Sequence, residues 1–367
     1  MLRLEARPQP SQAMSFASPL LALAITVLIG IVMFALLGKD PLRALQMFFY
    51  EPIKSAYAWT EIAVKATPLI LIGLGLAICY RSNVWNIGAE GQYVIGAVFA
   101  SGVAMQATAD TPRAIVLLIL LAGVAGGMVW AAIVALLRDR FNANEILVSL
   151  MLVYVALMVL SYLVYGPWKD PKGYNFPQTI TFAAPTKVPR LIEGFRLNIG
   201  VLIALAAVAL AWLFLFRTYR GFALQVGGLA PAAARYAGFS SRRALWTSML
   251  SCGALAGIAG VGEVIGPIGQ LTLSMSPGYG FAAIIVAYVG RLHPIGILFS
   301  SFIMALFYIG GELSQSRLGM PSAITGVFQG ILLFALLGCD SLIHYRIRFG
   351  RRSAGPARAA GVVITSP

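Results

Sequence analysis

The chain has 367 residues, of which 59% are apolar and only 11% are charged. Because soluble globular proteins carry about 25% charged residues, this composition excludes an ordinary soluble protein and indicates a chain that crosses a membrane several times. A net charge of +14 would suggest a nucleic-acid partner in a soluble chain. Here the basic residues lie between apolar runs, so we expect no nucleic acid and attribute the charge to membrane topology.

The N-terminal segment is basic and precedes a long apolar run. A secretory signal peptide likewise begins with basic residues and continues with an apolar run. Here the basic residues are Arg3 and Arg7, and the apolar run is Leu20–Gly38. The run is too long for a signal core, however, and the residues around Gly38 form a poor cleavage site. We therefore expect Leu20–Gly38 to be the first membrane span and residues 1–19 to be a cytoplasmic segment.

Ten apolar runs have the length or the setting of a membrane helix. The sequence therefore predicts an all-α, polytopic membrane protein of about ten transmembrane helices, with a transmembrane domain over residues 20–340. The expected spans are Leu20–Gly38, Ile62–Tyr80, Asn83–Ala107, Ala114–Leu137, Ile146–Tyr165, Leu197–Phe216, Ala244–Ile265, Pro277–Gly290, Ile295–Gly311 and Pro321–Gly338. We expect Pro68 to interrupt the second span, together with Gly73 and Gly75. In the fourth span, the small residues that allow close helix approach are Gly123, Gly126 and Gly127.

The third span begins with an unusually polar stretch. Asn83–Gly96 reads NVWNIGAEGQYVIG, and only Ala97–Ala107 after it is cleanly apolar. A carboxylate such as that of Glu90 costs roughly 2.5–3.5 kcal/mol at mid-membrane on insertion scales, so it usually faces a cavity or a partner. We favour a broken helix or a re-entrant segment within the membrane. A cytoplasmic loop over Arg81–Gln92, followed by a short helix, is the alternative.

The eighth span, Pro277–Gly290, begins in a similar way, with the residues SPGYGF. Broken, glycine-led segments at corresponding places in two halves of a chain point to a transporter's pathway. Spans two to five and seven to ten can therefore be internal repeats, with the pathway lined by spans two, three, seven and eight. The alternative is that glycine and proline are simply common in membrane helices.

Two polar segments set the expected topology. Residues 217–243 carry five arginines in a short loop, whereas residues 166–196 form a long loop rich in proline and lysine. The positive-inside rule places the first loop, and with it both chain termini, in the cytoplasm and the second loop outside. The basic tail, residues 341–367, is also placed in the cytoplasm and is expected to be disordered from His344 onward.

The cytoplasmic loop contains a candidate contact for a partner. Pro231 suits the first turn of a helix and Gly238 suits the position just after its end. The sequence therefore predicts a short amphipathic helix over Pro231–Ala237, isolated between Gly227-Gly228 and Gly238. Such a helix suits a groove in another protein, although an ordinary loop whose arginines bind the membrane surface is the alternative.

The sequence lacks the patterns of a catalytic or metal site. It contains no G-x-x-x-x-G-K-[ST] motif, so the chain cannot hold nucleotide phosphates in a P-loop. No Ser/His/Asp or metal-ligand cluster is recognisable, and His293 and His344 fall at span boundaries. Three cysteines fall within or at the end of apolar runs and are expected to form no disulfide: Cys79, Cys252 and Cys339. We predict that the chain is not an enzyme and binds no cofactor of its own.

Four stretches together resemble a known family: NVWNIGAEGQYVIGA from Asn83, FNANEILVSLMLVY (Phe141–Tyr154), the GPWKDP…FPQT loop, and PAAARYAGFS from Pro231. From about Leu20 to Gly338 the chain is similar to the integral-membrane permeases of bacterial ABC importers, the family that includes ribose and branched-chain amino acid permeases. NIGAEGQ and NANEI are similar to its nucleoside-type branch, which works with binding proteins of the basic membrane lipoprotein family.

This resemblance implies a permease subunit in the bacterial inner membrane that imports a small polar solute, with nucleosides expected. The implied partners are an ATP-binding subunit with two nucleotide-binding domains, a second permease and an extracytoplasmic substrate-binding protein, besides membrane lipid. ATP would be bound by the partner subunit. The residues implied to contact that subunit are Pro231, Ala234, Arg235, Tyr236, Gly238 and Phe239.

The chemistry of a nucleoside suggests which residues line the path. A nucleoside offers several hydrogen-bonding groups and an aromatic face. Asn86, Glu90 and Gln92 can meet the first and Trp85 the second, although interfacial anchoring is the commoner role for a membrane tryptophan. A sugar or a branched-chain amino acid remains an alternative solute. A stand-alone secondary transporter with Glu90 or Glu263 as proton relay, and a membrane scaffold without transport, are the other classes.

Overall fold

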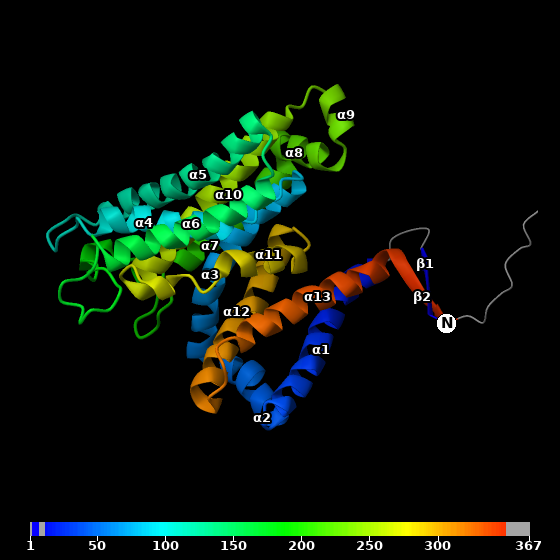
Figure 1. Ribbon diagram of the computed structural model, residues 1–367, viewed down its shortest axis with the longest axis horizontal. Coiled ribbons are helices and arrows are strands. Elements are labelled where there is room, and N and C mark those ends of the chain that lie inside the picture. The colour runs from blue at the N-terminus through cyan, green and yellow to red at the C-terminus, as the bar shows by residue number, and fades with distance from the viewer. Residues whose placement is uncertain (1, 7–11, 350–367) are drawn as a thin grey trace, which may run out of the picture. The chain divides into compact units, whose positions relative to one another are not determined.

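The computed structural model describes residues 2–6 and 12–349 (Figure 1). The chain divides into two units, one formed by residues 1–30 and 330–367 and the other by residues 31–329. Most of the described residues are helical, so the all-α, polytopic fold expected from the sequence is confirmed. The larger unit contains every residue of the candidate site.

All ten expected spans have a helix in their place. The α-helices of the described residues are α1 (Gln12–Leu36), α2 (Pro41–Leu45), α3 (Ala56–Arg81), α4 (Ala89–Ala104), α5 (Ile115–Phe141), α6 (Glu145–Tyr165), α7 (Gly200–Arg217), α8 (Tyr219–Leu229), α9 (Pro231–Tyr236), α10 (Ser241–Glu263), α11 (Tyr279–Val289), α12 (Pro294–Leu318) and α13 (Ile324–His344). Single turns of 3-10 or π-helix lie at Gln46–Tyr50, Glu51–Ile53, Ala184–Thr186, Val264–Ile268 and Leu273–Met275.

Two of the ten span helices are short, and they are the two that were expected to be broken. Within the described part of the chain, eight helices are long and apolar enough to cross a membrane. The helices α4 and α11 have only 16 and 11 residues. At 1.5 Å per residue they reach roughly 24 and 17 Å, against about 30 Å of hydrocarbon in a bilayer. Non-helical backbone precedes each of them, at residues 82–88 before α4 and at residues 269–272 and 276–278 before α11.

The long helix α3 packs against α7, α10, α11 and α12. It is continuous through Pro68, so the interruption expected there is wrong. Proline is tolerated in such a helix because neighbouring helices bury the disturbed turn. Gly75 does not break the helix either but lets α10 approach, since a Cβ at this position would lie 2.9 Å from the Cα of Cys252.

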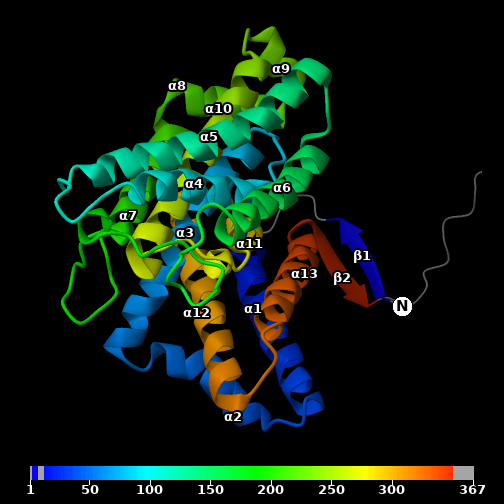
Figure 2. The ribbon, with the colours of Figure 1, turned by 60° about the vertical axis from the view of Figure 1, so that its left-hand side comes forward.

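Glycines bring α4, α5 and α10 into backbone contact. A Cβ at Gly127 of α5 would lie 3.0 Å from the Cα of Gly257 in α10, and a Cβ at Gly253 would lie 2.7 Å from the Cβ of Ala131. Gly96 of α4 also faces Gly257. The glycines of the fourth span therefore allow close helix approach as expected, and the three helices lie side by side (Figure 2).

The long loop after α6 is bound to the segment that leads into α11. The N–H of Thr179 donates to the carbonyl of Leu271 at 3.0 Å, and the N–H of Phe182 donates to the carbonyl of Gly269 at 2.9 Å. The carbonyls of Leu271 and Gly269 lie before α11 and have no partner within a helix, so these bonds from the loop satisfy them. The loop therefore fixes the non-helical approach to α11.

The smaller unit brings two terminal segments together. Strands β1 (Leu2–Ala6) and β2 (Tyr345–Phe349) pair in antiparallel register. The expectation of disorder from His344 onward is therefore wrong for residues 345–349, because β1 supplies hydrogen-bond partners that the tail alone lacks. The rest of the tail, residues 350–367, lies outside the described residues.

Candidate functional site

The turn between α3 and α4 is built by asparagines. Asn83 adopts a left-handed conformation, with φ of 56°, which asparagine tolerates better than most residues. The side-chain oxygen of Asn86 accepts a hydrogen bond from the N–H of Gly88 at 3.0 Å. A Cβ at Gly88 would lie 2.8 Å from the carbonyl oxygen of Ser149, so glycine is needed for the approach of α6. The polar residues of this motif thus shape the chain before α4 begins.

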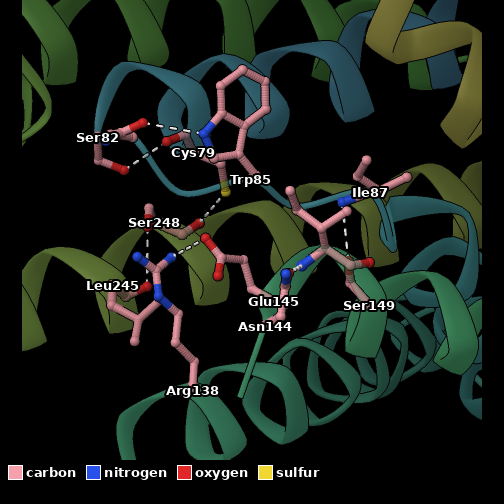
Figure 3. A network of polar contacts seen from close by, with 12 residues as sticks. Cys79, Ser82, Trp85, Ile87, Arg138, Asn144, Glu145, Ser149, Leu245 and Ser248 are labelled. Atoms are coloured by element: carbon pink, nitrogen blue, oxygen red, sulfur yellow. Dashed lines mark hydrogen bonds and ion pairs between the residues drawn. The ribbon is translucent and has the colours of Figure 1, made fainter. Parts of the chain in front are cut away.

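Figure 3 shows how this turn is held by its neighbours. The N–H of Ile87 donates to the hydroxyl of Ser149 in α6 at 3.2 Å. At the end of α3, the thiol of Cys79 donates to the carbonyl of Ser248 in α10 at 3.3 Å. The turn is therefore fixed to two other helices and not only to its own ends.

The NANEI motif ends α5 and begins α6. Asn142 closes α5 in a left-handed conformation, with φ of 51°, and Asn144 caps α6 by accepting a hydrogen bond from the N–H of Ile146 at 2.9 Å. Glu145 then pairs with Arg138 of α5 at 2.6 Å (Figure 3). Helix capping accounts for these residues. The motif positions the first turns of α6 against the turn before α4.

Asn86 and Gln92 form a buried pair of amides. Their side chains are fully or almost fully buried. The Asn86 Nδ2 donates to the Gln92 Oε1 at 3.2 Å, and the Gln92 Nε2 donates to the Asn86 Oδ1 at 3.4 Å. Nδ2 also lies 3.2 Å from the sulfur of Cys252 in α10. A buried polar group left without a partner costs about 1–3 kcal/mol, so this mutual pairing makes a polar interior tolerable at the start of α4.

Glu90 joins the two short helices. One carboxylate oxygen accepts a hydrogen bond from the hydroxyl of Ser276, and the other accepts one from the N–H of Gly280 in the first turn of α11. Gly278, the N-cap residue of α11, has no side chain to cap the helix. Glu90 therefore supplies, from a different helix, the acceptor and the negative charge that favour a helix N-terminus. Only 2% of Glu90 is exposed.

Three tyrosines surround this junction of α4 and α11. The hydroxyl of Tyr93 donates to the carbonyl of Met275 at 2.9 Å. The rings of Tyr93 and Tyr279 meet edge to face, with centroids 5.9 Å apart, and the ring of Tyr308 lies 5.4 Å from that of Tyr279. The ammonium group of Lys65 lies 5.9 Å from the Tyr279 ring. The junction is thus enclosed by aromatic side chains.

Trp85 lies apart from these buried groups. It is 42% exposed, and its indole N–H donates to the side-chain oxygen of Asn83 at 3.1 Å. Its ring lies 5.5 Å from that of Tyr80, which stacks on Tyr288 of α11. The four residues expected to line the path therefore divide into a buried group and one exposed ring. The buried group is Asn86, Glu90 and Gln92.

The helix expected in the basic loop is present as α9, with Pro231 at its first position and Gly238 just after its end. It is not isolated by a glycine break on its N-terminal side, because Gly227 and Gly228 lie within α8. A Cβ at Gly228 would lie 3.0 Å from the carbonyl carbon of Arg81. This glycine serves close packing of α8 on the end of α3, so the interpretation of both glycines as a break is wrong.

The residues of α9 differ in exposure. Tyr236 is 98% exposed, whereas Ala234 is 4% exposed and faces the protein's own surface. Phe239, just after α9, meets Tyr219 and Phe222 of α8 edge to face, at 5.7 and 6.3 Å. The other exposed members of the expected contact set are Pro231, Arg235 and Gly238.

Comparison with known proteins identifies the family. Residues 59–337, more than half of the chain, match the family described as branched-chain amino acid transport system / permease component. The chain belongs to this permease family. It is 33% identical to the glucose ABC transporter permease protein TsgB13 of Haloferax volcanii over 98% of each chain. It is 28% identical to the guanosine ABC transporter permease protein NupP of Bacillus subtilis over 90% of this chain and 94% of the relative.

A third relative, the nucleoside ABC transporter permease protein NupB of Lactococcus lactis, is 28% identical over 86% of this chain and 89% of its own. The resemblance drawn from the motifs is thereby confirmed. The permease is a multi-pass membrane subunit of ABC transport and, like its relatives, not an enzyme.

Sequence reasoning missed the residues that connect the permease's elements. The guanidinium of Arg81 donates to the side-chain oxygen of Gln225 in α8 at 2.7 Å and to the carbonyl of Leu292 at 2.8 Å. It thereby ties α8 to the end of α3 and to the chain after α11. From the sequence alone, an arginine at the end of a span is interpreted only as a marker of topology. The contacts of Ser276 and Gly280 with Glu90 were missed as well, because neither residue belongs to a sequence pattern that links it to Glu90.

Proposed function

We propose that this permease forms the path by which nucleosides enter the cytoplasm and that a separate ATP-binding subunit with two nucleotide-binding domains drives it. A second permease and an extracytoplasmic substrate-binding protein complete the importer. The complex lies in the bacterial inner membrane, with both termini of the permease in the cytoplasm. The motifs NIGAEGQ and NANEI and the names of the guanosine and nucleoside relatives support the choice of solute.

The observation that carries this proposal is the junction of α4 and α11 at Glu90. Short helices whose N-termini meet at membrane depth are where transporters bind polar solutes, because helix-end N–H groups and side chains replace water there. The amides of Asn86 and Gln92 lie in the same buried region and bond to each other. If the junction opens, these groups become available to the hydrogen-bonding groups of a base or a ribose.

A mechanical route leads from α9 to this junction. The chain passes from α9 directly into α10, whose first two turns are held to the end of α5. There the carboxylate of Asp139 accepts hydrogen bonds from the Nε of Arg242 at 2.7 Å and from the indole N–H of Trp246 at 3.1 Å. Because glycines pack α10, α5 and α4 without intervening side chains, a displacement of α9 by the ATP-binding subunit would move the three helices together. Glu90 would then shift relative to α11.

Uptake measurements test the proposal. The permease is expressed with its partner subunits in a host that lacks nucleoside uptake, and the entry of tritiated guanosine and uridine is measured. We expect uptake that requires every subunit and that is lost when the Walker A lysine of the ATP-binding subunit is replaced by alanine. Uptake that persists with this variant would contradict the proposal and support a stand-alone secondary transporter.

A sugar importer is the second candidate, because one of the relatives is a glucose permease that matches the permease over nearly its whole length. Uptake of radiolabelled glucose by the same complex distinguishes the two. Entry of glucose that a hundredfold excess of unlabelled nucleoside does not reduce would assign the transporter to sugars.

A further inference from the structure

Arg81, the last residue of α3, connects three other segments at the end of the larger unit where α8 and α9 lie (Figures 1 and 2). Its Nη1 donates to the side chain of Gln225 in α8 at 2.7 Å, and its Nε donates to the carbonyl of Leu292, in the turn after α11, at 2.8 Å. The guanidinium also lies 5.0 Å from the ring of Phe216 at the end of α7. Among the residues that the structure describes, no carboxylate forms an ion pair with it. This half-buried charge therefore joins α8 to the end of α11 and balances no acidic group.

The helix α8 is fixed to Arg81 in two ways. The amide of Gln225 uses both of its ends, since Oε1 accepts from Arg81 while Nε2 donates to the carbonyl of Leu215 in α7 at 2.6 Å. Gly228 lies so close to Arg81 that an added Cβ would be 3.0 Å from the carbonyl carbon of the arginine. A single residue separates α8 from α9, and Phe239, just after α9, packs on α8. A displacement of α9 is therefore passed to α8 and from there to Arg81.

The turn that receives the second hydrogen bond of Arg81 has a strained backbone. Arg291 and Leu292 both adopt a left-handed conformation, with φ of 58° and 53°, which residues larger than glycine rarely do. Such backbone persists only where its surroundings hold it, and it is found mainly at functional sites and switch segments. The N–H of Leu292 donates to the carbonyl of Ala287 in α11 at 2.8 Å, while Arg81 binds the carbonyl of Leu292. The turn is thus held by α11 on one side and by α3 on the other.

A displacement of this turn would reach the junction at Glu90. The helix α11 has only 11 residues, so it moves as one rigid body through its internal hydrogen bonds. Leu292 lies just beyond its last turn, and Gly280 in its first turn donates to Glu90. Tyr80 of α3 also stacks on Tyr288 in the last turn of α11, with ring centroids 5.4 Å apart. The end of α3 therefore contacts the end of α11 at two points.

We propose that Arg81 is a positioning residue through which the ATP-binding subunit moves α11. The inference rests on the proposed function and adds a second route to the one that leads from α9 through α10 and α5 to α4. The first route acts on the helix that carries Glu90, and the route through Arg81 acts on the helix that carries Gly280. Without the contacts of Arg81, ATP hydrolysis would still move α4, but α11 would no longer move in step with it. Hydrolysis would then proceed without import.

The ratio of ATP hydrolysed to solute imported tests this role. The complete importer is reconstituted in liposomes, with tritiated guanosine and radiolabelled glucose as the solutes. Arg81→Met keeps an unbranched side chain beside Phe216 but removes both donors, whereas Gln225→Met removes the acceptor on α8 and leaves the bond to Leu292 in place. Each should raise the ratio at least tenfold, while pull-down of the ATP-binding subunit stays at the wild-type level. Arg113→Met, at an exposed position between α4 and α5, should change neither.

A merely structural role of Arg81 would give a different result. It would lower the melting temperature, hydrolysis and uptake together and leave the ratio of ATP to solute unchanged, which would overturn the inference. The double variant of Arg81→Met and Gln225→Met should have the same ratio as Arg81→Met alone, because both substitutions remove one connection. Effects that multiply in the double variant would mean that the two residues act separately, and they would overturn it as well.

Distances between spin labels test the movement without a solute. The native cysteines are buried, so nitroxides can be attached at Leu229→Cys in α8 and Ile295→Cys at the start of α12, both of which are exposed positions. In the wild-type complex the distance should be the same with and without trapped ATP, because α8 and the turn before α12 move together. In Arg81→Met it should differ between the two states. A distance that changes equally in both proteins, or in neither, overturns the inference. Absence of ATP-dependent uptake of both solutes by the wild type rejects the proposed import instead, and the label distances then decide on Arg81 alone.

Discussion

The carboxylate of Glu90 in α4 accepts a hydrogen bond from the backbone N–H of Gly280 in α11, although the two residues are 190 positions apart. Each belongs to the first turn of a helix that is too short to cross a bilayer alone. One side chain therefore completes the N-terminus of a second helix and fixes the relative position of both. This contact makes the junction sensitive to small changes at a single residue.

Glu90→Gln should lower the free energy of unfolding by about 1–3 kcal/mol and reduce uptake. Ser276 and Gly280 both donate hydrogen bonds to Glu90, whereas an amide offers only one acceptor oxygen and turns an NH₂ group toward the other donor. Thermal unfolding in detergent measures the change, with Glu193→Gln in an exposed loop position as the control. Wild-type stability together with wild-type uptake would mean that Glu90 lies in a solvated loop.

Gly127→Ala should destabilise the permease by about 1–3 kcal/mol, the usual cost of inserting a methyl group into a well-packed core. Its Cβ would lie 3.0 Å from the Cα of Gly257, against backbone that cannot yield as a side chain can. Gly262→Ala is a matched control in α10, because nothing lies within 4 Å of the added Cβ. This control should be neutral or more stable by roughly 0.5–1 kcal/mol. Equal effects of the two substitutions would contradict close packing of α5 on α10.

Cysteine labelling of intact cells tests the proposed orientation. Lys172→Cys, in the long loop after α6, should react with a membrane-impermeant maleimide, and Ser241→Cys, at the start of α10, should not. Both positions are exposed, and the three native cysteines are buried, which keeps the background low. Labelling of position 241 but not of position 172 would reverse the topology.

Tyr236→Asp should weaken binding of the ATP-binding subunit without affecting folding. The side chain is almost wholly exposed on α9, so a new charge there is harmless until a partner buries it, when it costs several kcal/mol. Pull-down of the ATP-binding subunit and uptake should both fall at least tenfold, while the melting temperature stays unchanged. Tyr174→Asp, equally exposed in the other loop, is the control. Unchanged pull-down and uptake would remove α9 from the coupling mechanism.

Ala234 is a poorer test of the same surface. It belongs to the set of residues expected to contact the partner, but it is nearly buried against the permease's own chain. Ala234→Glu should therefore disturb the packing of α9 and lower stability as well as uptake. A variant that loses uptake without losing stability would show that Ala234 becomes accessible to the partner.

His293 should make the permease less stable in mild acid. Burial first, and the nearby charge of Arg81 second, lower the pKa of this side chain in the folded protein below its ordinary value of 6.5. As the pH falls through about 6.5, the unfolded chain takes up the proton more readily than the folded one, so stability decreases; above that pH the group has no effect. Melting temperatures between pH 7.5 and 5.5 should fall, and less so for His293→Asn. If the melting temperature of His293→Asn depended on pH as strongly as that of the wild type, the lowered pKa of His293 would be contradicted.

The helices could be predicted from the sequence because each is a run of apolar residues with a length that the bilayer sets. Even the two short helices were indicated, since polar and glycine residues cluster just before α4 and α11. The contacts between them could not be predicted. The partners of Glu90 are a backbone N–H and a serine hydroxyl, and neither has a signature in the sequence that links it to Glu90.

The errors have the same origin. Gly227 and Gly228 were interpreted from local propensity as a break, but packing of α8 on Arg81 requires a glycine within a helix there. Residues 345–349 were expected to be disordered as part of a basic tail, but they form a strand because β1 pairs with them from the other end of the chain. In both cases the decisive contact comes from a distant part of the chain, which the segment itself does not show.

The contact between Glu90 and Gly280 also sets an order of events during synthesis. At about 5–20 residues per second, a ribosome needs roughly 10–40 s to make the chain between them. During this interval α4 is in place with an acidic group that has neither Ser276 nor Gly280 to bind, a state that the hydrocarbon disfavours. Until α11 has been made, the first half of the permease therefore lacks the contact that compensates this buried acidic group. The full stability of α4 depends on a segment that is synthesised 190 residues later.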